Sequence, residues 1–562
     1  MAARRFLATL LAVALVGLGL GTGGWLLALR QSPLHQARQA LSVPEAARFI
    51  PRRAPLTLHW FTAADWPARY AASVAPTRRR EQAADALRRL RDGLFASAGL
   101  DYGSELAGWL GDEVSLSVLE PREGDAPSGW LLALRSRDEE GARRFLQRFW
   151  QIRSLAGADL TVSSYRGMGL ISGRGSLLGS PPRPLATALI NDRLVLIASG
   201  RGVLEEALDV SQIDELNLAA DPDLGAAVER LGSGVGLLTA RGGGLDRWLA
   251  VPSTLSDRGP QASLVAAIQP QDRTLAARVL LPWPAQPSPA LSPSPSAAPA
   301  TKPAATMVTS AELLERAGRG FDALALIDQP AALLQATAAG DPDGRPGVPS
   351  PWVQGLGPIL RGVLDREAGP LLQRLARADA GPLLLAWRQD GWLVGTDRDQ
   401  PPLAELSERL RLDGLAESPL VLDEVPLRIW SRLAAAPGRS GRLGELDASL
   451  VGARLEGEGR QAWWSNRLEL LRDHRLQPSQ PGPEVRRLQA LDAERAPVAL
   501  TLANPVATSL LSRWLPWTLL QGLAAQPLAP VVEGLDLVLE PLEPDAAERP
   551  LAELQARLRF SG

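Results

Sequence analysis

Side chains suited to catalysis are scarce in this chain of 562 residues. It has no cysteine, a single lysine at Lys302, and only three histidines, His35, His59 and His474. Neither H-E-x-x-H nor G-x-S-x-G occurs. Without cysteine there are no disulfides, thiolate nucleophiles or cysteine-ligated metals, and without a lysine in the body there is neither a P-loop nor a pyridoxal phosphate Schiff base. We therefore predict no catalytic residue, no cofactor and no metal site.

The carboxylates form no evident acid–base pair. Asp112 and Glu113 are neighbours in a strand-like segment, where adjacent side chains point to opposite faces of a sheet, so we expect a turn at a strand edge. Residues 341–344 (Asp-Pro-Asp-Gly) begin like a calcium loop but lack its third acidic position and its later bidentate glutamate. We expect a plain loop there. A metal-independent hydrolase built on carboxylates is accordingly the weakest alternative function.

Tryptophan is unusually frequent, with sixteen residues against three tyrosines and eight phenylalanines. Indoles line apolar ligand clefts and membrane-facing surfaces, and they also fill protein cores. We identify the densest pairs, Trp463 with Trp464 and Trp514 with Trp517, as candidate ligand or membrane contacts, and core packing is the competing interpretation. The apolar stretch 510–523 is too short for a second membrane span and is predicted to be a buried or interfacial helix.

A cluster of arginines precedes and enters a predicted helix at 81–95. Its first members are Arg78, Arg79 and Arg80. Guanidinium groups near a charged bilayer attract anionic headgroups, by about 1 kcal/mol each, so these three are candidate membrane contacts. A solvated helix face is the competing interpretation. The net charge of −2 provides no global basic field, and no nucleic-acid partner is expected.

The first thirty residues indicate where the protein works. Phe6 to Leu29 form an uncharged apolar run behind Arg4 and Arg5. As a helix this run is roughly 36 Å long, enough to cross a ~30 Å hydrocarbon core. The positive-inside rule places the amino terminus in the cytoplasm and the body across the membrane. A signal peptide cleaved near 21–23 is the alternative, and it delivers the body to the same compartment.

Glycines within this run suit close helix packing. Gly17 and Gly21 have the G-x-x-x-G spacing of helix–helix contacts, which makes a dimer through them a candidate interaction. Gly19, Gly21 and Gly24 also satisfy G-x-G-x-x-G, but a dinucleotide site needs a strand before the glycines and a helix after them. Inside a membrane segment that interpretation is rejected.

The remainder divides into two parts of similar length. Residues 1–30 are predicted to be a cytoplasmic tip and transmembrane anchor, and 31–53 a juxtamembrane stem. The Pro/Ser/Ala-rich segment 283–306 is predicted to be an extended linker. This leaves two units, 54–282 and 307–562, as expected for a body too large for one hydrophobic core.

Matched motifs indicate that the two units are a tandem duplication. The pairs, separated by 261 to 266 residues, are Arg247-Trp248-Leu249 with Arg513-Trp514-Leu515, Gly129-Trp130-Leu131 with Gly391-Trp392-Leu393, and Pro222 with Pro483.

Short apolar strands alternate with amphipathic helices in each unit. The predicted strands are 56–60, 114–119, 130–134, 161–172, 185–190, 193–198, 383–387, 392–394, 427–430, 449–455 and 461–464. The predicted helices are 81–95, 138–150, 203–208, 403–410 and 468–474. Consecutive short strands with a hairpin signal at Asn191-Asp192 favour an α+β fold with mixed, mainly antiparallel sheets rather than a doubly wound parallel one.

Several motifs of the first unit resemble a known family. They are Ala98-Gly99-Leu100-Asp101-Tyr102, Trp109-Leu110-Gly111-Asp112-Glu113, Phe145-Leu146-Gln147-Arg148-Phe149-Trp150 and Tyr165-Arg166-Gly167. Together with the basic start and the apolar anchor they resemble the cyanobacterial membrane-anchored family known as domain of unknown function 3352. The resemblance covers most of the body and is strongest over 54–210. It implies a protein of the cell envelope or thylakoid membrane and brings no catalytic residues.

The sequence favours a non-enzymatic binding or scaffold protein of the envelope or thylakoid. One apolar helix is expected to hold it in the membrane, with the body in the periplasm or the thylakoid lumen. A protein, lipid or glycan is the expected partner. The alternative is a module that handles lipids or apolar ligands in tryptophan-lined clefts.

Overall fold

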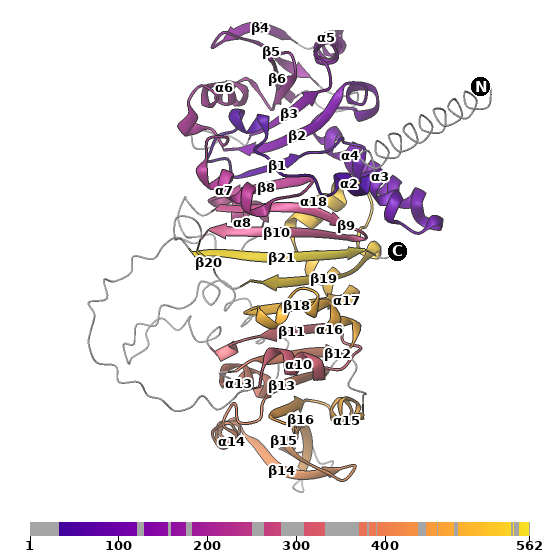
Figure 1. The fold of residues 1–562 in the computed structure, drawn as a ribbon, viewed down its shortest axis with the longest axis vertical. Coiled ribbons are helices and arrows are strands. Elements are labelled where there is room, and N and C mark those ends of the chain that lie inside the picture. The colour runs from indigo at the N-terminus through magenta and orange to yellow at the C-terminus, as the bar shows by residue number, and fades with distance from the viewer. Residues whose placement is uncertain are drawn as a thin grey trace, which may run out of the picture.

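One antiparallel sheet of 21 strands runs along the molecule, and helices pack against its sides (Figure 1). The computed structural model describes residues 33–120, 129–155, 159–175, 183–249, 263–282, 308–331, 370–378, 381–388, 391–435, 446–457, 459–476, 481–540, 543–544 and 550–560. Every strand pairing within these ranges is antiparallel. The expected α+β class with mainly antiparallel strands is therefore confirmed.

The first half of the chain supplies ten strands of the sheet. Along the sheet they follow the order β4-β5-β6-β7-β3-β2-β1-β8-β9-β10. Their bounds are β1 (Leu56–Trp60), β2 (Leu110–Leu119), β3 (Gly129–Ser136), β4 (Leu160–Tyr165), β5 (Met168–Gly175), β6 (Arg183–Ile190), β7 (Leu194–Ala198), β8 (Gly236–Arg241), β9 (Ser263–Gln271) and β10 (Thr274–Pro282).

The second half supplies the others, in the order β14-β15-β16-β17-β13-β12-β11-β18-β19-β21. The short β20 pairs only with β21. Their bounds are β11 (Ala323–Ile327), β12 (Leu383–Arg388), β13 (Gly391–Asp397), β14 (Leu415–Leu422), β15 (Val425–Ala435), β16 (Leu446–Glu456), β17 (Gln461–Ser465), β18 (Val498–Ala503), β19 (Val532–Leu539), β20 (Glu543–Pro544) and β21 (Pro550–Phe560).

The two halves meet where β10 pairs with β21. Their register runs from Thr274 opposite Arg559 to Pro282 opposite Leu551, and the two strands lie near the middle of the molecule in Figure 1. We call this junction the seam. The two sheets thus become one.

Each half of the chain contributes seven of the α-helices in the described residues. Those of the first half are α2 (Pro33–Gln36), α3 (Trp66–Val74), α4 (Arg80–Ser97), α5 (Glu139–Leu155), α6 (Arg201–Val210), α7 (Pro222–Leu231) and α8 (Gly243–Leu249). Those of the second are α10 (Ser310–Arg316), α13 (Pro370–Ala378), α14 (Leu403–Leu412), α15 (Leu468–Leu476), α16 (Pro483–Gln489), α17 (Asn504–Leu511) and α18 (Leu515–Ala524). Single helical turns are η1 (Glu45–Phe49), η2 (Thr77–Arg79), η3 (Tyr102–Leu106), η4 (Asp214–Leu216), η5 (Ala493–Arg495) and η6 (Ala529–Val531).

Alternate residues of the central strands enter cores on opposite faces of the sheet, as the two-residue period of a strand requires. In the second half, Leu324 of β11 packs with α10 and α16 on one face, whereas Ala323 packs with α17 on the other. In the first half, Leu237 of β8 packs with α6 and α7, whereas Ala240 packs with α8. Both faces of the sheet are therefore covered by helices.

The predicted elements agree with the structure except at one place. The segment expected as one strand at 161–172 is a hairpin, because Arg166 and Gly167 have φ of 51° and 79° and turn the chain between β4 and β5. The stretch 510–523, expected to be helical with an interruption at Pro516, forms two helices, α17 and α18. Pro516 lies in the first turn of α18, where its missing N–H removes no helical hydrogen bond. The turn at Asn191-Asp192 is confirmed by positive φ at both residues.

The predicted anchor (Phe6 to Leu29), the linker at 283–306 and the loop at 341–344 lie outside the described residues. Within the part of the chain that the structure describes, no helix has both the length and the apolar character needed to cross a membrane.

Candidate functional site

The first pair of predicted tryptophans lies inside the second half. Trp463 and Trp464 are adjacent on β17 and only 2% and 1% exposed. Trp464 stacks on Trp430 with ring centroids 5.4 Å apart, and its Nε1 donates to Thr396 Oγ1 at 3.1 Å. Trp463 packs in the core of the opposite face, against the His474 ring. These two indoles fill cores rather than line a surface cleft.

The second pair divides between core and surface. Trp517 of α18 is 4% exposed and packs with Leu511 and Val532. Trp514, the residue before α18, is 40% exposed, and its Nε1 donates to the Leu249 carbonyl oxygen of the first half at 2.7 Å. Trp514 is thus a surface indole beside the seam, and the structure does not bring the four tryptophans together.

Exposed apolar side chains are concentrated in the segment that contains Trp514. They are between 37% and 48% exposed. The sequence pointed to this segment, because it predicted a buried or interfacial helix at 510–523 with Trp514 as a candidate membrane contact, but it did not predict which side chains are exposed; no charged residue occurs between Arg513 and Glu533. The water-exposed surface of a soluble protein rarely carries this many large apolar side chains in one segment unless a partner covers them. We call this set the α18 surface and define it as Leu510, Trp514, Leu515, Leu519, Leu520 and Val531.

Helix α4, which begins at the predicted arginine cluster, packs against α18. At their contact a Cβ on Gly93 would overlap the Leu523 carbonyl oxygen, so only glycine permits this approach. Arg78, Arg79 and Arg80 are exposed at the other end of α4. The arginine cluster and the α18 surface are therefore carried by two helices in direct contact.

The start of the described chain lies on the side of the molecule that carries α4 and α18. Helix α2 contacts α3, and Ala37 is buried with Trp66 and Tyr70 of α3. Helix α3 in turn packs along α4. Figure 1 shows α2, α3, α4 and α18 gathered beside the first half. The stem thus leads directly to the helices that carry the candidate contacts.

The two described histidine side chains differ in burial but are both neutral at physiological pH. His59 of β1 is fully buried and shares a 2.7 Å hydrogen bond between its Nδ1 and Ser115 Oγ. Burial lowers the pKa of His59 to about 3. His474 of α15 is half-buried against the Trp463 ring. Burial and the nearby Arg316 lower the pKa of His474 to about 4.

The adjacent carboxylates point apart, as expected. Asp112 is exposed, whereas Glu113 is 7% exposed and accepts a hydrogen bond from the Ala46 backbone N–H at 3.2 Å. Glu113 Oε2 lies 3.7 Å from Arg135 Nη1. Burial raises the pKa of Glu113 despite these two partners. The pair lies where the β2–β3 register shifts, so its role is structural.

Other buried carboxylates are held by arginines far away in sequence, and no local motif could have revealed them. Asp221, 2% exposed, forms ion pairs with Arg52 at 2.8 Å and with Arg241. Glu553, 3% exposed, faces Arg278 and Arg230 across the seam. Among the described residues no group of three histidine, cysteine or acidic side chains is placed to hold a metal ion.

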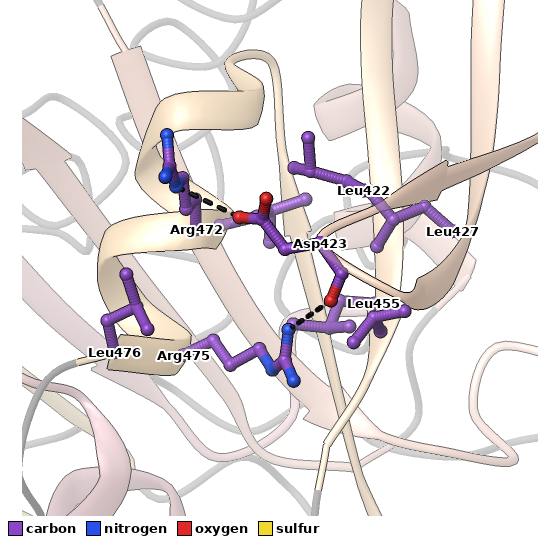
Figure 2. A pocket seen from close by; sticks show the side chains of 9 residues that line it. Leu422, Asp423, Leu427, Leu455, Arg472, Arg475 and Leu476 are labelled. Carbon is purple, nitrogen blue, oxygen red and sulfur yellow. Dashed lines mark hydrogen bonds and ion pairs between the residues drawn. The ribbon is translucent and has the colours of Figure 1, made fainter.

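A small pocket lies near the outer end of the second half, between α15 and the β14–β15 turn (Figure 2). Arg472 Nε pairs with Asp423 Oδ2 at 3.0 Å, and Arg475 Nη1 donates to the Asp423 carbonyl oxygen at 3.1 Å. Leu427 and Leu455 contribute to its apolar lining. Its volume of about 20 Å³ holds roughly one water molecule. The pocket is too small for a lipid chain.

These features define an α+β protein built on one long antiparallel sheet, with buried polar groups in structural roles and an apolar surface beside the stem. The chain belongs to the family described as protein of unknown function (DUF3352), whose model matches residues 10–342. The predicted family membership is thus confirmed.

Comparison with curated proteins gives no match. Among solved structures, crystal form I of TP0453 matches with 10% identity and a TM-score of 0.25, over 45% of this chain and 93% of that chain. Crystal form III of TP0453 matches with 10% identity and a TM-score of 0.23, over 43% and 80%. At these scores the similarity carries no conclusion about fold or function.

Proposed function

We propose that this protein is a non-enzymatic binding or scaffold protein, attached to a membrane by Phe6 to Leu29 and carrying its body in the periplasm or thylakoid lumen. The observation that carries the proposal is the seam, because it turns two sheet-plus-helix halves into one rigid platform. A platform of this kind can hold two binding surfaces at a fixed separation.

The contacts across the seam support this rigidity. Beyond the β10–β21 hydrogen bonds, Glu553 of the second half accepts a hydrogen bond from Arg278 Nε of the first at 2.9 Å. Glu553 also lies 3.5 Å from Arg230 Nε. Helix α18 of the second half packs on α4 and α8 of the first. Rotation of one half relative to the other would have to break the β10–β21 hydrogen bonds, the Glu553 ion pairs and the packing of α18 on α4 and α8.

We further propose that the halves arose by tandem duplication. The strand orders of the two halves match position by position, from β4 with β14 at the outer ends to β10 with β21 at the seam. The matched glycines support the same conclusion: a Cβ on Gly129 would overlap Val203 of α6, and one on Gly391 would overlap Leu470 of α15.

The residue after each of these glycines makes an equivalent hydrogen bond. The backbone N–H of Trp130 donates to Ser199 Oγ at 2.9 Å, and that of Trp392 donates to Asn466 Oδ1 at 2.9 Å. Pro222 and Pro483 both occupy the first position of a helix, in α7 and α16. Duplication gives a scaffold two related surfaces without requiring a second gene product.

The lipid-handling alternative is favoured by one specific observation, the exposed α18 surface. No comparable observation favours the carboxylate hydrolase, because the buried acids described above face arginines.

Proximity labelling in the native membrane tests the scaffold proposal. The labelling enzyme is fused to the full chain after Gly562, and the matched control carries the same enzyme after residue 53. We expect the full chain to enrich a reproducible set of periplasmic or lumenal proteins that the control does not enrich. Identical protein sets for both fusions would refute a binding role of the body. Turnover of esters, peptides or glycosides by the purified full chain would refute the non-enzymatic assignment.

A further inference from the structure

We propose that the α18 surface lies in the interfacial layer of the membrane to which the stem is attached, with the phospholipid bilayer as its partner. The inference rests on the proposed membrane attachment and adds a second contact between body and bilayer. Such a contact adds a second point of attachment, and two points restrict the orientation of the sheet relative to the membrane more than one does.

The composition of the α18 surface matches the proposed partner. Leu515 and Leu519 are one helical turn apart on α18 and are 38% and 46% exposed, and Leu520, about 100° around the helix from Leu519, is 37% exposed. Leu510 and Val531 extend the surface on either side of the helix in sequence. Amphipathic helices with exposed leucines and aromatic residues lie in the plane of the bilayer interface with their apolar faces among the lipids.

Trp514 has the arrangement of an interfacial indole. Its ring is 40% exposed, while its N–H is already bonded to the Leu249 carbonyl oxygen at 2.7 Å. The ring can therefore enter an apolar layer without leaving a polar hydrogen unsatisfied. Tryptophan is enriched at the membrane–water boundary for this combination of apolar ring and anchored N–H.

The position of the stem brings the membrane within reach of this surface. The predicted span ends at Leu29, and the described chain begins at Pro33. Four residues extend at most about 14 Å, so Pro33 is held close to the bilayer boundary. From α2 the contacts run through α3 and α4 to α18. Because packed helices are separated by about 8–10 Å, these three contacts place α18 within about 30 Å of α2.

The charges near this surface favour the same partner. Arg513 immediately precedes Trp514 and is exposed. Arg78, Arg79 and Arg80 are exposed at the start of α4, about 20 Å along that helix from the contact of Gly93 with α18. Between Arg513 and Glu533 the chain carries no acidic group that would be repelled by anionic headgroups, and Asp92 beside Gly93 is paired with Arg91. At the α18 surface itself, Arg513 is the basic side chain that suits anionic headgroups.

The absence of cysteine makes a direct test simple. A single thiol is introduced in the full-length chain by Leu519→Cys, labelled with bimane and reconstituted into vesicles of phosphatidylcholine and phosphatidylglycerol. Lipids brominated along the acyl chain then report whether the label touches the bilayer. We expect brominated lipids to remove most of the bimane fluorescence, with a blue-shifted emission.

Two further labelled variants complete the experiment. Leu412→Cys is the matched control, because Leu412 is a 78% exposed leucine at the outer end of the second half. Its label is expected to keep its fluorescence in brominated vesicles. Ala14→Cys places the label within the predicted span, where quenching reports attachment itself.

The outcomes separate the inference from the proposed function. Quenching at 14 but not at 519 overturns the inference and leaves the anchor intact. Quenching at 519 but not at 14 supports the α18 contact and overturns the anchor, whereas no quenching at either position overturns both. A blue shift at 519 without bromine quenching overturns the inference in favour of a second protein chain covering the surface.

Discussion

Truncation of Trp464 distinguishes a core tryptophan from a ligand-binding one. Trp464 is 1% exposed, stacks on Trp430 and donates its N–H to Thr396 Oγ1. Replacing a buried tryptophan by alanine costs about 3–5 kcal/mol, and the lost stacking adds about 0.5–1.5 kcal/mol. Thr396 Oγ1 still donates to the Asp397 carbonyl oxygen, so no hydroxyl proton is stranded. We therefore expect Trp464→Ala to lower the free energy of unfolding of the second half by about 3.5–6.5 kcal/mol.

The assay is urea denaturation combined with hydrogen exchange of the strands around β17, which reports the second half directly. The matched control is Trp514→Ala, because Trp514 is 40% exposed and its truncation removes one hydrogen bond and part of an exposed ring. We expect a loss of about 1 kcal/mol for that control. Equal small losses for both variants would refute the core assignment of Trp464 and restore a ligand role.

Two further predictions concern buried polar groups. Asp221→Ala removes a carboxylate that faces Arg241 and also caps α7 through the Asp223 N–H, so it should destabilise the first half by about 3 kcal/mol or more in urea denaturation. Asp221→Asn keeps a capping oxygen and should lose about 1 kcal/mol less; an equal loss in both variants would contradict the capping role. His59 stays neutral in the folded state, because its pKa is about 3 there against 6.5 in the unfolded chain. Its contribution to the free energy of unfolding is therefore complete above pH 6.5 and is lost as the pH falls toward 3. Compared with the parent chain, His59→Asn should reduce the loss of stability between pH 7 and pH 5 by about 2 kcal/mol; an unchanged pH profile would show that His59 is protonated in the folded protein.

Local structure was largely predictable because it depends on neighbours in the chain. Strand β1 matches its predicted range, and the helix expected at 81–95 lies within α4. The failure is also local in origin. The hairpin of β4 and β5 was missed although Gly167 is a turn residue, because its partner at positive φ is Arg166 rather than the asparagine, aspartate or glycine that usually precedes glycine in a tight hairpin turn.

The candidate site was predicted less well, because exposure depends on what packs against a residue. Trp463 and Trp514 look alike in sequence, because each has a second tryptophan within three residues. Trp463 is covered by both a helix and neighbouring strands, whereas no described element covers Trp514 completely. The uncharged stretch from 514 to 532 indicated an unusual segment but could not tell which of its leucines face solvent.

The sequence by itself determined the family, the kinds of chemistry that missing cysteine and lysine exclude, and the alternation of short strands and helices. These follow from residue types and short-range periodicity. Only the tertiary structure decided how the halves are joined, because the β10–β21 seam brings together residues almost three hundred positions apart. The same long-range pairing places α18 against α4 and leaves its leucines exposed beside the stem. Contacts of this separation depend on the packing of whole elements, and no local pattern specifies them.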